Sequence, residues 1–180
     1  MDPLVAHERA QDAFARVLSQ VGDDQLDAET PCSEWRVRDL VGHVIAGNQR
    51  MAGIAASPTP DSAAALIGAH ADLAQAAQLA FSAPDGMTRP FETRSGSLPG
   101  SVVIGMRTAD VVTHAWDLAR ATGQPTDIDE ELAEQVLAAS RERMGTAPRA
   151  PGGPFGDAQP CDDARPAADR LAAFLGRAVS

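Results

Sequence analysis

Apolar residues recur at steps of three and four positions through most of this chain, which is the spacing of one buried face of an α-helix. The first run covers residues 3–21 and contains Leu4, Ala10, Phe14, Val17, Leu18 and Val21. The same pattern predicts further helices, one beginning near residue 36 and others over about 61–82, 101–122, 128–143 and 166–177. Tyrosine is absent and alanine is frequent, which favours closely packed helices over a sheet. We therefore expect an all-α, antiparallel up-down bundle.

Two segments interrupt the helical pattern. Residues 83–100 are rich in proline and glycine, so we expect a loop there, with room for a short extended piece from Phe91 to Arg94. Residues 147–166 are similarly rich in proline and glycine and precede the terminal helix. We expect one domain over residues 1–180, with a core of about 3–144 and a connection and docking helix over 145–180.

Charge and composition exclude several classes of protein. The net charge of −10 argues against nonspecific binding to nucleic acid or to an anionic membrane. No run approaches the roughly 20 apolar residues of a membrane span, and the N-terminal residues lack the features of a signal peptide. Cys32 and Cys161 do not make a disulfide framework. We expect a cytoplasmic protein that binds neither nucleic acid nor membrane.

An acid and a histidine in the fourth expected helix form the first candidate site. Asp110 and His114 are four residues apart, so their side chains lie one above the other on the same helix face. His43, in the second helix, could lie beside them and supply a third donor. Three protein donors with an open position are typical of catalytic zinc. The alternatives are a packed histidine at position 43 and an ion pair of Asp110 with Arg107 or Arg120.

Other polar residues carry weaker signals. Asp117 could orient a ligand imidazole or serve a structural role, and the structural role is favoured. We expect His7 and His70 to lie on the surface, because neither has an acid or imidazole at useful spacing. Cys32 precedes the second helix and is expected to be a buried, inert thiol, since no basic residue adjoins it in a useful position. The chain contains no glycine-rich phosphate loop or dinucleotide fingerprint.

Three separated stretches resemble a known family. They are Thr30-Pro-Cys-Ser-Glu-Trp35 continuing to His43, Asp110-Val-Val-Thr-His114 continuing to Gly123, and Asp169 to Arg177. Together they are similar to the mycothiol-dependent maleylpyruvate isomerase metal-binding domain of the DinB-like superfamily, in a short, single-domain actinobacterial form. The resemblance implies a DinB-like four-helix bundle holding a divalent metal, usually zinc, with nickel or another transition metal as alternatives.

The resemblance also implies the ligands and the chemistry. The family's metal ligands fall on His43, Asp110 and His114, although members commonly have glutamate where this chain has the shorter Asp110. The implied function is a mycothiol-dependent transferase or isomerase that acts on a small electrophilic substrate. A non-catalytic metal-binding or ligand-binding bundle and a metal-dependent hydrolase are the alternatives. A homodimer is left open.

Overall fold

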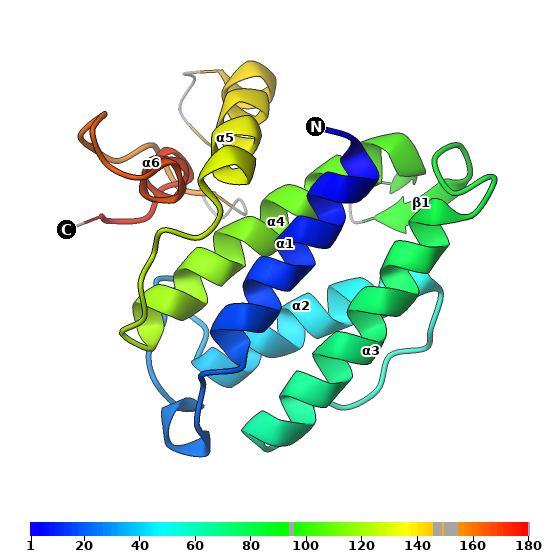
Figure 1. The fold of residues 1–180 in the computed structure, drawn as a ribbon, viewed down its shortest axis with the longest axis horizontal. Helices are drawn as coiled ribbons and strands as arrows, with labels where there is room; N and C mark the ends of the chain where they lie inside the picture. The colour runs from blue at the N-terminus through cyan, green and yellow to red at the C-terminus, as the bar shows by residue number, and fades with distance from the viewer. Residues whose placement is uncertain (94–95, 146–148, 150–154, 180) are drawn as a thin grey trace.

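The computed structural model describes residues 1–93, 96–145, 149 and 155–179 (Figure 1). Within them the helices are α1 Pro3–Leu18, α2 Val37–Ala52, α3 Ala63–Ser82, α4 Gly100–Ala121, α5 Glu130–Met144 and α6 Ala167–Phe174, with a 3₁₀ turn at Asp23–Gln25. The predicted all-α bundle is confirmed. Each predicted helix is present, although α1 and α6 end at Leu18 and Phe174, three residues before the expected positions 21 and 177.

Local signals explain where the helices begin and end. The side chains of Asp2, Ser62 and Asp129 cap α1, α3 and α5 by accepting hydrogen bonds from backbone N–H groups in the first turn. Gly53 ends α2 and Gly123 follows the end of α4, each with φ of 70°, a left-handed conformation that glycine adopts without a side-chain clash.

A small antiparallel hairpin precedes α4. Its strands are β1 Pro90–Thr93 and β2 Gly96–Pro99, and Phe91 pairs with Leu98. Phe91 is buried, and its ring centroid lies 5.0 Å from that of Phe81 on α3, so the hairpin packs onto the bundle. The expected extended piece is thus present at Pro90–Thr93, whereas its last expected residue, Arg94, lies outside the described residues.

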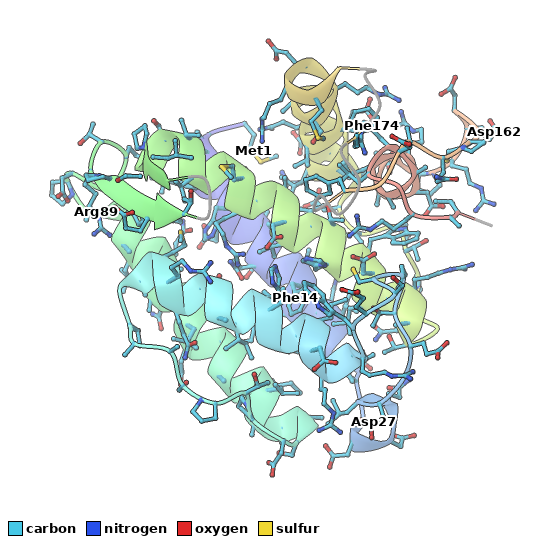
Figure 2. All side chains as sticks on the ribbon, turned by 180° about the vertical axis from the view of Figure 1, so that it is seen from behind. Met1, Phe14, Asp27, Arg89, Asp162 and Phe174 are labelled. Carbon is cyan, nitrogen blue, oxygen red and sulfur yellow. The ribbon has the colours of Figure 1, made fainter. Side chains whose placement is uncertain are left out.

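The first four helices form the bundle (Figure 1), and its main apolar core continues into α5 and α6. α1 packs against α4 and α3, and α2 packs against α3 and α4. Phe14 of α1 lies fully buried in the middle of the bundle (Figure 2) and belongs to the same apolar cluster as Leu40, Val44 and Leu66 of the other helices. Buried Ala6, Ala10 and Ala13 allow α1 to approach its neighbours closely.

The last two helices pack on one side of this bundle. α6 contacts both α5 and α4. The indole Nε1–H of Trp116, on α4, donates a 2.7 Å hydrogen bond to Asp169 Oδ1 on α6, and both residues are buried. Burial of a Trp N–H requires such a partner, so this bond fixes where α6 docks.

Among the described helices, none is long and apolar enough to cross a membrane.

The prediction that His7 and His70 lie on the surface is wrong. Both are buried among neutral partners: His7 Nδ1 lies 2.6 Å from Gln78 Oε1, and His70 Nε2 lies 3.1 Å from Gln11 Oε1. Burial lowers the pKa of each histidine to about 4, and the positive charge of Arg107 acts in the same direction. Both imidazoles are therefore neutral near pH 7, and a neutral ring costs less free energy to bury than a charged one.

Candidate metal centre

α2 and α4 bring the three predicted donors together. His43 Nε2 lies 3.3 Å from both carboxylate oxygens of Asp110, and His114 Nε2 lies 3.4 Å from Asp110 Oδ1. One donor atom from each residue lies within 4.8 Å of the other two. The predicted convergence of the second and fourth helices at these residues is thus observed. Their role as metal ligands stays a prediction.

The spacing of these donors fits a divalent metal. Donors at about 2.0–2.1 Å from a tetrahedral zinc ion are separated from one another by roughly 3.3–3.4 Å. The Asp110 distances to His43 and His114 fall in that range, and they are longer than the usual hydrogen bond of about 2.9–3.0 Å. The shorter aspartate side chain therefore reaches both imidazoles in this bundle.

Arg107 is the counter-charge of Asp110. It lies one turn earlier on α4, and its Nη1 donates a 2.5 Å hydrogen bond to Asp110 Oδ2. Burial alone would raise the pKa of the Asp110 carboxyl, but Arg107 and hydrogen bonds from His114 and His43 hold it well below its usual range. The carboxylate is therefore ionised at neutral pH and available as an anionic donor.

Asp117 fixes the orientation of the His114 ring. The fully buried Asp117 carboxylate accepts a 3.0 Å hydrogen bond from His114 Nδ1, because an ionised carboxylate can only accept. This leaves Nε2 facing Asp110 and His43. Burial lowers the pKa of His114, but its hydrogen bonds to Asp110, Asp117 and Cys32 raise it well above its usual value. Asp117 thus contacts a candidate ligand directly, although the sequence favoured a structural role.

Arg177, which sequence reasoning missed, completes this arrangement from the C-terminal end. Its Nε and Nη2 donate hydrogen bonds of 3.2 and 3.0 Å to the two oxygens of Asp117. Burial raises the pKa of the Asp117 carboxyl, yet His114 and Arg177 lower it overall. No local pattern signals this pair, because the two residues are 60 positions apart.

Cys32 is half-buried rather than fully buried as expected, and its side chain faces the Asp117–Arg177 ion pair. Its thiol donates to Asp117 Oδ2 at 3.4 Å, and Arg177 Nη2 lies 3.6 Å from Sγ. A basic partner is therefore present, although it comes from the far end of the chain. Cys32, His114 and Asp117 also have the spacing of a metal-binding group. We place the candidate metal at the other group, because Arg177 bonds both oxygens of Asp117, whereas Arg107 bonds Asp110 through Oδ2 and Asp110 Oδ1 faces the two imidazoles.

Trp35 covers one side of the candidate donors. Thr30 Oγ1 lies 2.9 Å from the Trp35 carbonyl and accepts a 3.1 Å hydrogen bond from the Cys32 N–H, which folds the loop before α2 into a compact turn. The turn places the indole ring 4.7 Å from the His43 ring and 5.5 Å from the His114 ring, centroid to centroid. Solvent still reaches the site, since the side chains of His43 and Asp110 are 30% and 27% exposed.

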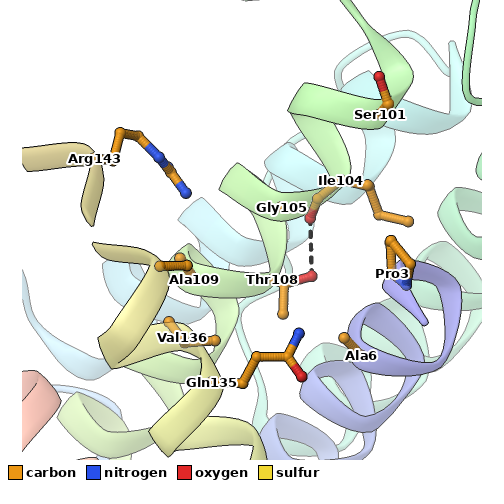
Figure 3. Close-up of a pocket in the computed structure, with 11 residues that line it drawn as sticks. Pro3, Ala6, Ser101, Ile104, Gly105, Thr108, Ala109, Gln135, Val136 and Arg143 are labelled. Atoms are coloured by element: carbon orange, nitrogen blue, oxygen red, sulfur yellow. Dashed lines mark hydrogen bonds between the residues drawn. The ribbon is translucent and has the colours of Figure 1, made fainter. Parts of the chain in front are cut away.

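A separate hollow of about 140 Å³ lies between α1, α4 and α5 (Figure 3). Its lining includes Ala6, Ile104, Thr108 and Val136, and none of the three candidate donors. Thr108 and Asp110 are two residues apart on α4, which places them about 200° apart around the helix. The hollow therefore lies on a different face of α4 from the candidate metal centre.

The helical arrangement of this chain is found in solved structures of another protein. Two crystal structures of the mycothiol-dependent maleylpyruvate isomerase, one of them a point mutant, match with TM-scores of 0.60 and 0.61 and sequence identities of 21% and 20%. Each match covers 77% of this chain and 68% of the isomerase chain. At this identity the likeness shows the shared fold.

Sequence comparison places the chain more closely. Two proteins of Mycobacterium tuberculosis, from strains CDC 1551 / Oshkosh and H37Rv and both described as uncharacterized, are 54% identical over 99% of this chain and the whole of theirs. The family model described as the mycothiol maleylpyruvate isomerase N-terminal domain matches residues 7–119, a range that contains all three candidate donors. This chain therefore belongs to the mycothiol maleylpyruvate isomerase N-terminal domain family.

Proposed function

We propose that this protein is a metal-dependent enzyme that uses a low-molecular-weight thiol, mycothiol, as a transferase or isomerase acting on a small electrophilic substrate. The observation that carries the proposal is the convergence of His43, Asp110 and His114 within 4.8 Å in a member of this family. Zinc suits two imidazoles and a carboxylate, and nickel or another transition metal remains an alternative.

The charges around the donors support a thiol-binding role. Asp110 is paired with Arg107, and Asp117 is paired with Arg177, so each carboxylate near the site has its own cation. A metal bound here would lower the pKa of a coordinated thiol and hold it as the thiolate. Because the arginines offset both carboxylates, the protein adds no net negative charge that would repel an anionic thiolate.

The protein's own side chains orient and shield the site. Asp117 holds His114 with Nε2 toward the donors, and Trp35 covers the imidazoles on one side. The exposed parts of His43 and Asp110 provide the approach for a thiol and a substrate. This access supports an active site over a non-catalytic bundle, for which we would expect a closed and dry centre.

A metal-dependent hydrolase is less well supported. Such an enzyme needs a general base near the metal. The acids of the described residues that adjoin the candidate donors are Asp110 and Asp117. Each is engaged by an arginine, and the pKa of each lies below its usual value, so neither is suited to accept a proton at neutral pH.

The test combines metal content with thiol binding. Elemental analysis of protein never exposed to chelator should find about one metal ion per chain, the content of a three-donor centre. Calorimetry should detect mycothiol binding. His114→Ala should lose both, whereas the control Asp72→Asn, at an exposed position on α3, should keep both. Wild-type protein without stoichiometric metal, or mycothiol binding that persists without metal, would refute the proposal. A cytoplasmic location and one domain over 1–180 stay predictions, and a homodimer is left open.

A further inference from the structure

A buried guanidinium lies beside the candidate metal centre without being one of its donors. The Arg107 side chain is 9% exposed and links α4 to α2. Its Nη1 donates to Asp110 Oδ2, and its Nη2 donates to the carbonyl of Val44 at 3.3 Å and to Asn48 Oδ1 at 3.0 Å. Nη1 therefore bonds a candidate ligand on α4, while Nη2 is held by hydrogen bonds to α2.

The backbone of α2 provides the space for this side chain. Gly47 lies against the guanidinium of Arg107, and a Cβ at this position would approach three of its atoms to less than 3.0 Å. Any other residue at position 47 would have to displace Arg107 or move α2. The packing therefore fixes the plane of the guanidinium as well as its charge.

A hydrogen-bond network holds the anchored arm. Asn48 Oδ1 accepts from Arg107 and also from Gln11 Nε2 at 2.9 Å, and Asn48 Nδ2 donates to Gln11 Oε1 at 3.1 Å. Gln11 lies on α1 and in turn contacts His70 of α3 and His7 of α1. All four helices of the bundle thus contribute to the position of one guanidinium. Since both histidines are neutral, Arg107 is the cation of this network.

The two oxygens of Asp110 have different surroundings as a result. Oδ1 lies within 3.4 Å of Nε2 on both His43 and His114. Oδ2 is also 3.3 Å from His43, but it carries the 2.5 Å charge-assisted hydrogen bond from Arg107. A short charge-assisted hydrogen bond occupies one of the two lone pairs of Oδ2 and reduces the charge that this oxygen can offer a metal. Oδ2 is therefore a poor second donor to a metal.

We propose that Arg107 is a positioning residue that restricts Asp110 to one donor oxygen and thereby keeps a coordination position open for an external ligand. This inference rests on the proposed metal centre. A carboxylate with both oxygens free can bind a metal in the bidentate mode and fill that position itself. With Arg107 in place, His43, Asp110 and His114 would supply three donor atoms to a metal, and a coordination position would be left for a thiol.

The test replaces the metal with Co²⁺, whose visible absorption is strong in four-coordinate sites and weaker at higher coordination number. Wild-type protein should bind Co²⁺ with strong visible bands. Arg107→Met should retain Co²⁺ but show weaker bands, because the released carboxylate binds through both oxygens. The matched control is Arg50→Met. Arg50 is an exposed arginine on α2 that does not contact Asp110, so the Co²⁺ bands of this variant should resemble those of wild type.

A second variant covers the case in which Arg107→Met fails to fold. Gly47→Ala keeps the charge of Arg107 but pushes the guanidinium off α2, so its Co²⁺ bands should also weaken. Circular dichroism and the melting temperature report folding of each variant. Metal uptake with unchanged bands in the folded variants would overturn this role alone, as would complete loss of metal binding from folded Arg107→Met. Wild-type protein that takes up no metal would overturn the proposed metal centre and this role with it.

Discussion

Asp117 lies one turn after His114 on α4, and its buried carboxylate accepts a 3.0 Å hydrogen bond from Nδ1 of that imidazole. The same carboxylate accepts two hydrogen bonds from Arg177, which lies close to the C-terminus. A candidate metal ligand is therefore oriented by a residue that the C-terminal segment holds in place. Partners of this kind set both the tautomer and the direction of a ligating histidine.

Replacing Asp117 should weaken metal binding without removing a metal donor. In Asp117→Asn the amide can still accept from His114, but the negative charge is lost, so we expect the dissociation constant for Zn²⁺ to rise by about 10-fold to 100-fold. Competition with a chromophoric chelator measures it. Asp72→Asn, an exposed position on α3, is the control and should bind like wild type. An unchanged constant in Asp117→Asn would argue that the His114 ring is held by packing alone.

Arg177 should matter more for stability than another arginine of the same C-terminal region. The Asp117 carboxylate is fully buried and the Arg177 side chain is 9% exposed, so Arg177→Ala leaves a buried carboxylate without its cation, at a cost of about 3–5 kcal/mol. Arg170 instead pairs with Glu134 at the surface, and Arg170→Ala should cost about 1 kcal/mol or less. Urea unfolding gives both values. Equal losses would show that the Arg177 pair contributes no more than a surface contact.

The two buried histidines should make the fold sensitive to mild acid. Their pKa is lowered to about 4, whereas an unfolded histidine titrates near 6.5. The unfolded chain therefore takes up protons first as the pH falls, and the free energy of unfolding decreases between about pH 6.5 and 4. Each of His7 and His70 contributes up to about 1.4 kcal/mol per pH unit in this range.

A single substitution separates this effect from other titrations. The raised pKa of His114 stabilises the fold at low pH and so acts in the opposite direction, which makes the comparison of variants necessary. Between pH 7 and pH 5, His70→Gln should lose about 2 kcal/mol less stability than wild type. Chemical unfolding at the two pH values measures the difference. Parallel pH profiles would contradict burial of neutral His70.

Trp35 should report metal binding by fluorescence. The chain has two tryptophans, and Trp116 lies in the core, hydrogen-bonded to Asp169, so Trp116→Phe leaves Trp35 as the sole indole. Because its ring lies 4.7 Å from His43, we expect Co²⁺ to quench its emission strongly. Trp35→Phe, which keeps Trp116, should show much weaker quenching. Equal quenching in both variants would place the bound metal away from His43.

Sequence reasoning was most successful where the governing interactions are local. Apolar periodicity and capping residues act within a few positions, and so the helices were found with ends displaced by up to three residues. The pairing of Asp110 with His114 follows from one helical turn, and the placement of His43 beside them required only that α2 and α4 be neighbours. Arg107 was one of two expected counter-charges for Asp110, and it is the one that contacts it.

The errors concern burial and partners from distant parts of the chain. His7 and His70 were expected at the surface, because the amide oxygens that they contact, on Gln78 and Gln11, belong to residues 71 and 59 positions away. Cys32 was judged without its basic neighbour Arg177, which is 145 positions away. In each case the polar group meets a partner only after the helices have packed.

The sequence by itself therefore determined the helices, their order and the acid–histidine pair, because hydrogen bonding and side-chain spacing within a helix depend on near neighbours. Only the tertiary structure decided which charges are neutralised and which ring nitrogens face the candidate metal. Arg107 reaches across to α2, and Arg177 returns from the C-terminal segment to Asp117. Such contacts join residues far apart in the chain, and their strength comes from burial that exists only in the packed bundle.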